Sequence, residues 1–167
     1  MLRIALDSSS LSQTVEILRK YGVASACHIL LADPTGGIGL EFSHLDLLKI
    51  EMENGIVCHS NHFLIPHHPD VNEAVFLPDS KYRIKRVWEL VLAAKEKGKR
   101  EGRLGFEEIG RILEDEGNYP GAINRGKVVE TNSETLFSIL MDLRERKARV
   151  RHGRPTEALE EFELCPA

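Results

Sequence analysis

The first apolar pattern with helical spacing covers residues 11–21. A helix is predicted there, because Ser10 and Gln13 occupy the N-cap and N3 positions of a capping box. Gly22 follows at the position where glycine commonly ends a helix. The mostly apolar residues 2–6 have no signal for a helix start, so we expect the end of a helix that begins upstream. This pattern suggests that the chain is a fragment.

Two further helices are predicted in the middle of the chain. A long helix covers about residues 80–97, with Asp79 or Ser80 as its N-cap, and its apolar residues form one stripe. A short amphipathic helix begins near Phe106 and is ended by Gly117.

Residues 25–63 change from helical spacing to short apolar or alternating runs, a pattern typical of β-strands. One hairpin is predicted around residues 33–37, since Asp, Pro, Thr and two glycines separate two such runs. A second turn is predicted at Asn54-Gly55, because this dipeptide is a strong hairpin signal. The region therefore predicts four antiparallel strands in sequence order. The expected strands are 26–31, 38–42, 47–52 and 56–60.

Near the C-terminus, residues 135–142 and 148–151 flank a charged stretch and predict a last hairpin. The tail after Pro155 is acidic. The order of elements is therefore helix, strands, two helices and strands. This segregation favours an α+β fold with helices covering an antiparallel sheet, and the length favours a single domain over residues 1–167.

The composition excludes some classes of protein. The chain of 167 residues has a net charge of −4, so nothing marks it as a nucleic-acid binder. Its apolar runs are shorter than the roughly 20 residues that a membrane span needs. Three scattered cysteines do not make a disulfide framework, so we expect a cytoplasmic protein. From the net charge and the short apolar runs we expect neither nucleic acid nor a membrane as partner.

The densest polar cluster covers residues 58–62 and 67–70 and contains four histidines and a cysteine. These side chains are good zinc ligands, so one hypothesis is a small metal-binding module that uses the His59–Asp70 cluster. The spacing matches no structural zinc pattern, and strand-end and loop histidines are the alternative. Within the cluster, Asn61 carries a neutral amide that suits a developing oxyanion, although an ordinary loop asparagine also fits.

Residues 81–103 contain nine lysines and arginines and only three acids, so this stretch could bind phosphates. Cations in the first turns of a helix oppose its dipole. We therefore expect Arg83 and Arg86 to be held by nearby carboxylates such as Asp79, and we favour a solvated helix face.

Eight short stretches then follow one another along nearly the whole chain. They are Leu2-Arg3-Ile4-Ala5-Leu6-Asp7-Ser8 with Ser12-Gln13, Ala24-Ser25-Ala26, Gly39-Leu40-Glu41-Phe42-Ser43, His59-Ser60-Asn61-His62, Leu77-Pro78-Asp79-Ser80 with Arg83 and Arg86, Asn118-Tyr119-Pro120, Thr135-Leu136-Phe137-Ser138-Ile139, and Val150-Arg151-His152-Gly153-Arg154-Pro155-Thr156. In this order they resemble the acyl-CoA:6-aminopenicillanic acid acyltransferase family, also called isopenicillin-N acyltransferases.

The resemblance implies the four-layer αββα fold of N-terminal-nucleophile hydrolases. In such enzymes self-cleavage exposes a cysteine at a new N-terminus, and its α-amine serves as the base. An acyl group passes to the thiol and then to an amine or to water. The implied partners are a small acyl donor and an amine or amide substrate; no resident cofactor is implied, and acyl-CoA is a possible co-substrate.

By the resemblance, Asn61 corresponds to the asparagine of the family's His-Thr-Asn-His motif, which helps to form the oxyanion hole; Ser60 replaces the threonine. The family's substrate-facing arginine falls on Asn132 and the serine beside it on Thr131, so both are candidate substrate-binding positions. The loss of the arginine makes a substrate carboxylate a less expected partner.

The resemblance places the nucleophilic cysteine upstream of Met1, and none of Cys27, Cys58 and Cys165 corresponds to it. We therefore expect the C-terminal portion of an acyltransferase or amide hydrolase, inactive alone, that forms part of the αββα sandwich. A further alternative is an interaction module that pairs with an upstream chain, or with itself, through an open sheet edge.

Overall fold

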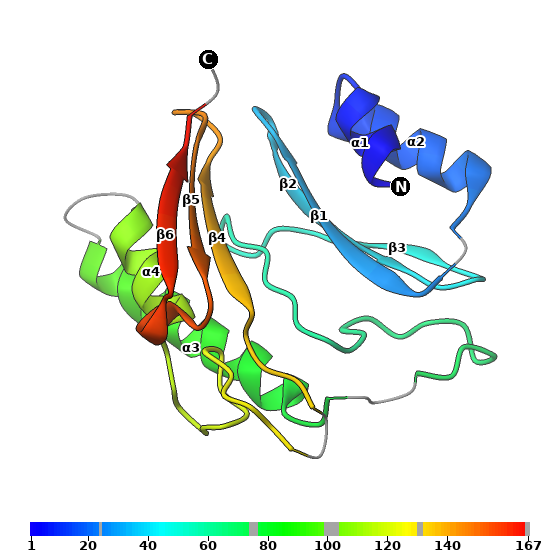
Figure 1. Cartoon of the computed structure of the whole chain (residues 1–167). Helices are drawn as coiled ribbons and strands as arrows, with labels where there is room; N and C mark the ends of the chain where they lie inside the picture. The colour runs from blue at the N-terminus through cyan, green and yellow to red at the C-terminus, as the bar shows by residue number, and fades with distance from the viewer. Residues whose placement is uncertain (24, 74–76, 99–103, 130–131, 166–167) are drawn as a thin grey trace. The chain divides into compact units, whose positions relative to one another are not determined.

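The computed structural model describes residues 1–23, 25–73, 77–98, 104–129 and 132–165. The chain divides into two compact units, Met1–Val75 and Phe76–Ala167 (Figure 1). Each contains α-helices and one three-stranded antiparallel sheet, which confirms the α+β class. The αββα sandwich and the single domain stay predictions.

The first unit has two helices and the sheet β1-β2-β3. Its elements are α1 Leu2–Asp7, α2 Leu11–Tyr21, β1 Cys27–Asp33, β2 Gly36–Phe42 and β3 Leu47–Ile50. The helix over residues 11–21 and the first hairpin are thus confirmed. At the start of α2, the Gln13 N–H donates to Ser10 Oγ over 3.2 Å, while Gln13 Oε1 accepts from Ser9 N over 2.5 Å.

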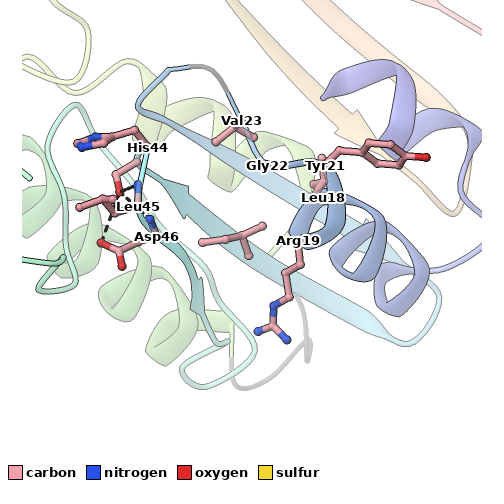
Figure 2. A pocket seen from close by; sticks show the side chains of 10 residues that line it. Leu18, Arg19, Tyr21, Gly22, Val23, His44, Leu45 and Asp46 are labelled. Carbon is pink, nitrogen blue, oxygen red and sulfur yellow. Dashed lines mark hydrogen bonds between the residues drawn. The ribbon is translucent and has the colours of Figure 1, made fainter.

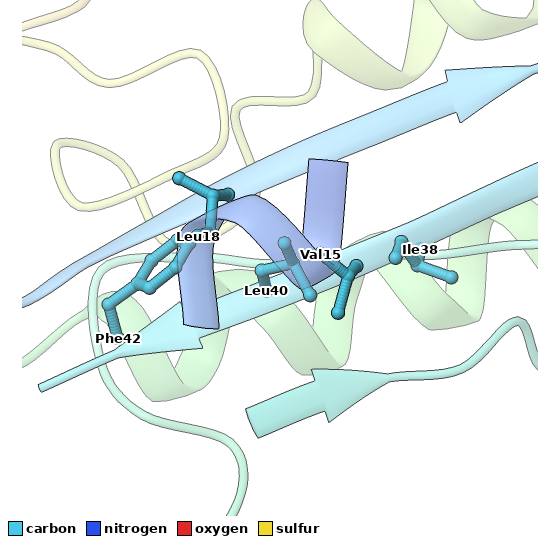
Figure 3. Close-up of a cluster of buried hydrophobic side chains, with 5 residues drawn as sticks. All are labelled: Val15, Leu18, Ile38, Leu40 and Phe42. Carbon is cyan, nitrogen blue, oxygen red and sulfur yellow. The ribbon is translucent and has the colours of Figure 1, made fainter. Parts of the chain in front are cut away.

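The core of this unit lies between α2 and the central strand β2 (Figure 3). Val15 and Leu18 from the helix pack with Ile38, Leu40 and Phe42 from the strand. The alternation of β2 places these three strand residues on one face and Gly39 and Glu41 on the other. The helix side of the sheet is therefore apolar, and the opposite side is available for polar groups.

The prediction of a fourth strand at residues 56–60 is wrong. The turn is confirmed, since Asn54 and Gly55 have φ of 53° and 77° and Glu53 bridges Ile56. Beyond Ile56 the chain leaves the sheet, because His59 hydrogen-bonds to Glu41 on the polar face of β2 instead of continuing a ladder. The segment therefore covers that face.

The second unit has helices and the sheet β4-β5-β6. Its elements are α3 Ser80–Gly98, α4 Phe106–Leu113, β4 Phe137–Asp142, β5 Lys147–His152, the 3-10 helix Pro155–Glu157 and β6 Glu160–Leu164. The long helix and the last hairpin are confirmed. Strand β6 was missed by the sequence analysis. Its apolar residues Phe162 and Leu164 alternate with glutamates and are exposed, and the strand pairs with β5.

Helix α4 ends at Leu113, before the predicted stop at Gly117. The intervening acids are held outside the helix: Asp115 accepts from Arg86 over 2.8 Å and from the Gly117 N–H over 3.2 Å. The local sequence alone does not reveal the pairing of Asp115 with Arg86, which lies 29 residues away along the chain.

The arginines at the start of α3 are paired with carboxylates, as expected. Asp79 accepts from Arg83 over 2.8 Å and also from the buried Arg125. The partner of Arg86 differs from the expectation, since it is chiefly Asp115 and, more distantly, Glu89. The side-chain hydrogen bonds from Arg86 hold the pKa of Asp115 below its ordinary value. These arginines therefore stabilise the fold through carboxylate partners, which does not favour a role in binding phosphate.

The two faces of the second sheet differ. Leu140 of β4 is buried and lies next to Gly110 of α4. The register places Ile139, Val150 and Phe162 in one row on the other face, and Met141 and Leu164 in the next. Ile139, Met141, Phe162 and Leu164 are all exposed, Met141 by 62%. Within the described second unit this face has no cover.

None of the helices in the described parts of the chain is long and apolar enough to cross a membrane.

Candidate functional site

A cavity of about 790 Å³ lies on the polar side of the first sheet. The segment after β3 supplies much of its wall, including Asn61, and β1 supplies Cys27 and His28. Its described lining residues are Ser25, Ala26, Cys27, His28, Ser43, His44, His59, Ser60, Asn61, His62, Phe63, Val71, Asn72 and Glu73. Residues 59–62 of the polar cluster singled out in the sequence thus line one hollow, whereas Cys58 and residues 67–70 are not among its lining.

Glu41 is the anchor of this wall. Its side chain is 0% exposed, and Oε1 accepts from His59 Nε2 over 2.7 Å and from the Leu64 N–H over 2.6 Å. The other oxygen accepts from the Ile65 N–H over 3.1 Å and from His67 Nε2 over 3.3 Å. Burial raises the pKa of Glu41, but these hydrogen bonds outweigh burial and hold the pKa below its ordinary value. The carboxylate is therefore ionised at neutral pH.

A second carboxylate supports the far end of the segment. Asp46 Oδ2 accepts from the His68 N–H over 2.7 Å and lies 3.2 Å from His67 Nδ1. The His68 N–H is the main cause that lowers the pKa of Asp46. The ring of Phe63 stacks on His67 with 3.8 Å between centroids. The segment is thus held by polar and aromatic contacts at both ends.

His28 completes the imidazole layer. It pairs across the strands with Glu41, and its ring stacks on His59 with 3.7 Å between centroids and 1° between planes. Glycine at position 39 makes room for it, because a Cβ there would lie 2.6 Å from His28 Nε2. Burial lowers the pKa of His28 to about 4, with a further contribution from His59. This ring is therefore neutral at pH 7.

Asn61 lies in the anchored segment, two residues after His59, and is exposed at the cavity. An amide donor held at the wall of a cavity can stabilise negative charge that develops on a carbonyl oxygen. The arrangement therefore suits acyl transfer or amide hydrolysis, provided that a nucleophile enters the same cavity.

The metal hypothesis gains no geometric support. Among the described residues, no three His, Cys, Asp or Glu side chains gather in a way that could hold a metal ion. His59 and His67 instead point to the same carboxylate, Glu41.

A second hollow, of about 670 Å³, lies between the C-terminal end of α2 and the turn after β2 (Figure 2). Arg19 and Asp46 line it with mostly apolar neighbours. Ser43 Oγ accepts from the Asp46 N–H over 2.8 Å and thereby fixes the turn. Its described lining residues include no cysteine and no asparagine or glutamine side chain, so nothing in this hollow points to acyl chemistry.

The sequence of the chain is also similar to known proteins. The sequence pattern of the family described as acyl-coenzyme A:6-aminopenicillanic acid acyl-transferase matches residues 1–157. The chain belongs to this acyltransferase family. One relative is the acyl-coenzyme A:6-aminopenicillanic-acid-acyltransferase 40 kDa form of Emericella nidulans, which is 38% identical over 165 residues. The match covers 96% of this chain but 44% of the relative, so the chain spans less than half of the relative's length.

The three cysteines of this acyltransferase family member are free thiols. Burial raises the pKa of Cys27 and of Cys58 above the ordinary value. A thiol with a raised pKa is a poor nucleophile near neutral pH, because the thiolate is the reactive form. Cys27 lines the cavity, but burial raises its pKa by more than the N-terminal amine lowers it.

The two candidate substrate-binding positions lie in the second unit. Asn132 is exposed in a turn, with φ of 45°, and its N–H donates to the Val129 carbonyl over 3.3 Å. Thr131 lies outside the described residues. Their roles stay predictions, as does the role of Asn61.

We expect acidification from pH 7 to pH 5 to destabilise the first unit through His28, by about 1 to 2 kcal/mol. An exposed histidine titrates near pH 6.5, whereas the pKa of His28 is about 4. Between these values the unfolded chain binds a proton that the folded chain refuses, so stability present above pH 6.5 is lost as the pH falls toward 4. Urea unfolding, followed through the NMR signals of Leu18, measures the slope. His28→Phe keeps a flat ring and should remove this part of the slope; an unchanged slope contradicts the assignment.

Proposed function

We propose that this chain is the oxyanion-stabilising portion of an acyltransferase or amide hydrolase that forms a thioester on an N-terminal cysteine. The observation that carries the proposal is the position of Asn61, at the wall of a cavity and inside an anchored segment, in a chain matched by the family over residues 1–157. The nucleophilic cysteine is proposed to come from the part of the enzyme that corresponds to the unmatched length of the relative.

In the proposed reaction, the α-amine of that cysteine takes the thiol proton, since its pKa of about 7.7 to 8.0 suits neutral pH. The sulfur attacks the carbonyl carbon of the acyl donor, and the carbonyl oxygen becomes an oxyanion that accepts a hydrogen bond from Asn61 Nδ2. Collapse breaks the bond to the leaving thiol or amine, which takes the proton. An amine or water then attacks the thioester through the same oxyanion and releases the cysteine thiol.

We also propose that the complete enzyme adopts the αββα sandwich. Support comes from the second sheet, whose one face packs on α4 and whose other face exposes Ile139, Met141 and Phe162. Sheet faces of this kind pack against a second sheet in a sandwich.

We propose that the acceptor has no carboxylate where the family's arginine, here replaced by Asn132, would bind one. Asn132 has no charge to offer there, so it cannot form the paired hydrogen bonds that an arginine makes to a carboxylate. A neutral amide or amine partner fits the chain better than penicillin chemistry.

The test compares this chain alone with a chimera in which it replaces the matched 165 residues of the Emericella nidulans relative. With an acyl-CoA donor and an amine acceptor, a thiol reagent should detect CoA release by the chimera and none by the chain alone. Turnover by the isolated chain that survives replacement of Cys27, Cys58 and Cys165 would overturn the proposed chemistry. An inactive but folded chimera would count against the role of the chain in catalysis.

A further inference from the structure

Glu41 is a buried ionised group that the proposed reaction does not use. It lies on β2, on the face opposite the core residues Leu40 and Phe42, and it is 0% exposed. A buried carboxylate is costly unless donors satisfy it, and here four donors do so. The four donors show which part of the chain this carboxylate binds.

All four donors belong to the single segment 59–67, and they lie on both sides of Asn61. His59 is two residues before it; the Leu64 and Ile65 N–H groups are three and four residues after it. Both backbone donors and the His59 ring lie within 3.1 Å of the carboxylate oxygens. The chain between the anchors is therefore a short loop closed on one charged side chain.

We propose that Glu41 is a positioning residue that holds segment 59–67, and with it the Asn61 amide, at the cavity wall. This inference rests on the proposed function for the role of Asn61, but not for the anchoring itself. An oxyanion donor contributes only when it is fixed where the charge develops, and displacement by about 1 Å can cost about 100-fold in rate.

The charged and titratable groups around Glu41 suit this role. His59 and His67 donate to it directly, and His28 from β1 stacks on His59. Asp46 binds the end of the segment through His67 and the His68 N–H. Additional support comes from Glu73, which accepts from the Phe63 N–H inside the loop. These contacts restrain the loop from β1, from β2, from the turn after β2 and from the chain that follows the loop.

The first experiment uses NMR on the 167-residue chain and needs no activity. Glu41→Gln replaces one carboxylate oxygen by an amide nitrogen, which cannot accept. Leu64 and Ile65 donate to different oxygens of Glu41, so the amide that faces the new nitrogen should exchange with solvent at least 10-fold faster, and the Asn61 side-chain signals should shift. The matched control is Glu16→Gln on the exposed side of α2, which should change none of these signals. Leu64 and Ile65 protected as in the wild type, with Asn61 unmoved, would overturn the proposal.

A second measurement is needed if Glu41→Gln does not fold. Loss of hydrogen-exchange protection at the Leu18 amide would report that failure. In the wild-type chain, acid titration of the Glu41 carboxyl carbon should shift the Asn61, Leu64 and Ile65 signals with the same midpoint. If the Asn61, Leu64 and Ile65 signals do not shift with the midpoint of Glu41, the proposal that Glu41 anchors the segment is overturned.

A third arm separates this inference from the proposed function. In the active chimera, Glu41→Gln should lower kcat about 10- to 100-fold with little change in KM, since a donor is misplaced and the binding contacts remain. A chimera that is inactive with Glu41 intact counts against the proposed function alone, because the NMR measurements still decide the role of Glu41. Unchanged kcat in an active chimera counts against the positioning role alone.

Discussion

Replacement of Asn61 by alanine in the chimera is expected to lower kcat by about 100- to 1000-fold, the usual loss when one oxyanion donor is removed. The substitution takes away an amide at the cavity wall and leaves the Glu41 contacts of the segment intact. KM should change little, because the hydrogen bond strengthens as charge develops on the oxygen and adds little to ground-state binding. Steady-state CoA release at saturating donor measures kcat directly.

The control removes a side-chain amide outside the cavity. Asn54→Gly suits the positive φ of 53° at the turn after β3, so the turn should be retained. This variant should keep kcat within about 2-fold of the kcat of the unsubstituted chimera, since surface substitutions away from the cavity have small effects. A kcat for Asn61→Ala that matches the Asn54→Gly value would remove Asn61 from the reaction.

The helices of this chain could be predicted because their signals are local. Ser10, Gln13 and Gly22 lie within one stretch, and the helix Leu11–Tyr21 has the predicted bounds. The Asn54-Gly55 turn is likewise local, and both residues have the positive φ that the dipeptide favours. Local backbone preference is enough for such elements, so they follow from the sequence.

The absence of a strand after that turn could not be predicted from local sequence. Residues 56–60 have the apolar content of a strand, but a distant carboxylate on β2 competes for His59. Strand β6 was missed for the opposite reason. Its glutamates are typical of a solvated tail, but pairing with β5 and the contact of Glu161 with Arg151 stabilise a strand there. Both outcomes depend on contacts between residues far apart in the sequence.

The candidate site was half predictable. The density of histidines around Asn61 indicated where to look, and two of the four, His59 and His62, line the same cavity as Asn61. Glu41 was missed as a functional residue, because an acid that alternates with Leu40 and Phe42 normally faces water. The available signal was the neighbouring Gly39, which leaves space on that face for His28. A charged residue beside a glycine in a central strand is therefore worth treating as a buried polar site.

The same central strand should dominate the stability of the first unit. Phe42 is fully buried against Leu18, so Phe42→Ala is expected to lower the free energy of unfolding by about 3 to 5 kcal/mol. The loss combines the transfer of the ring out of the core with the cavity that remains beneath α2. Hydrogen exchange of the α2 and β2 amides measures this unit without requiring the whole chain to unfold in two states.

The matched control lies on the neighbouring strand β1, where Leu30 is 58% exposed. Leu30→Ala removes a large apolar side chain from the same sheet and should cost less than about 1 kcal/mol, because little area leaves contact. Phe42→Leu should fall between the two, since part of the volume is retained. Equal losses for Phe42→Ala and Leu30→Ala would mean that the packing of α2 on β2 does not stabilise this unit. The polar face would then lose its rigid support as well, because Glu41 shares its strand with the core residues on either side.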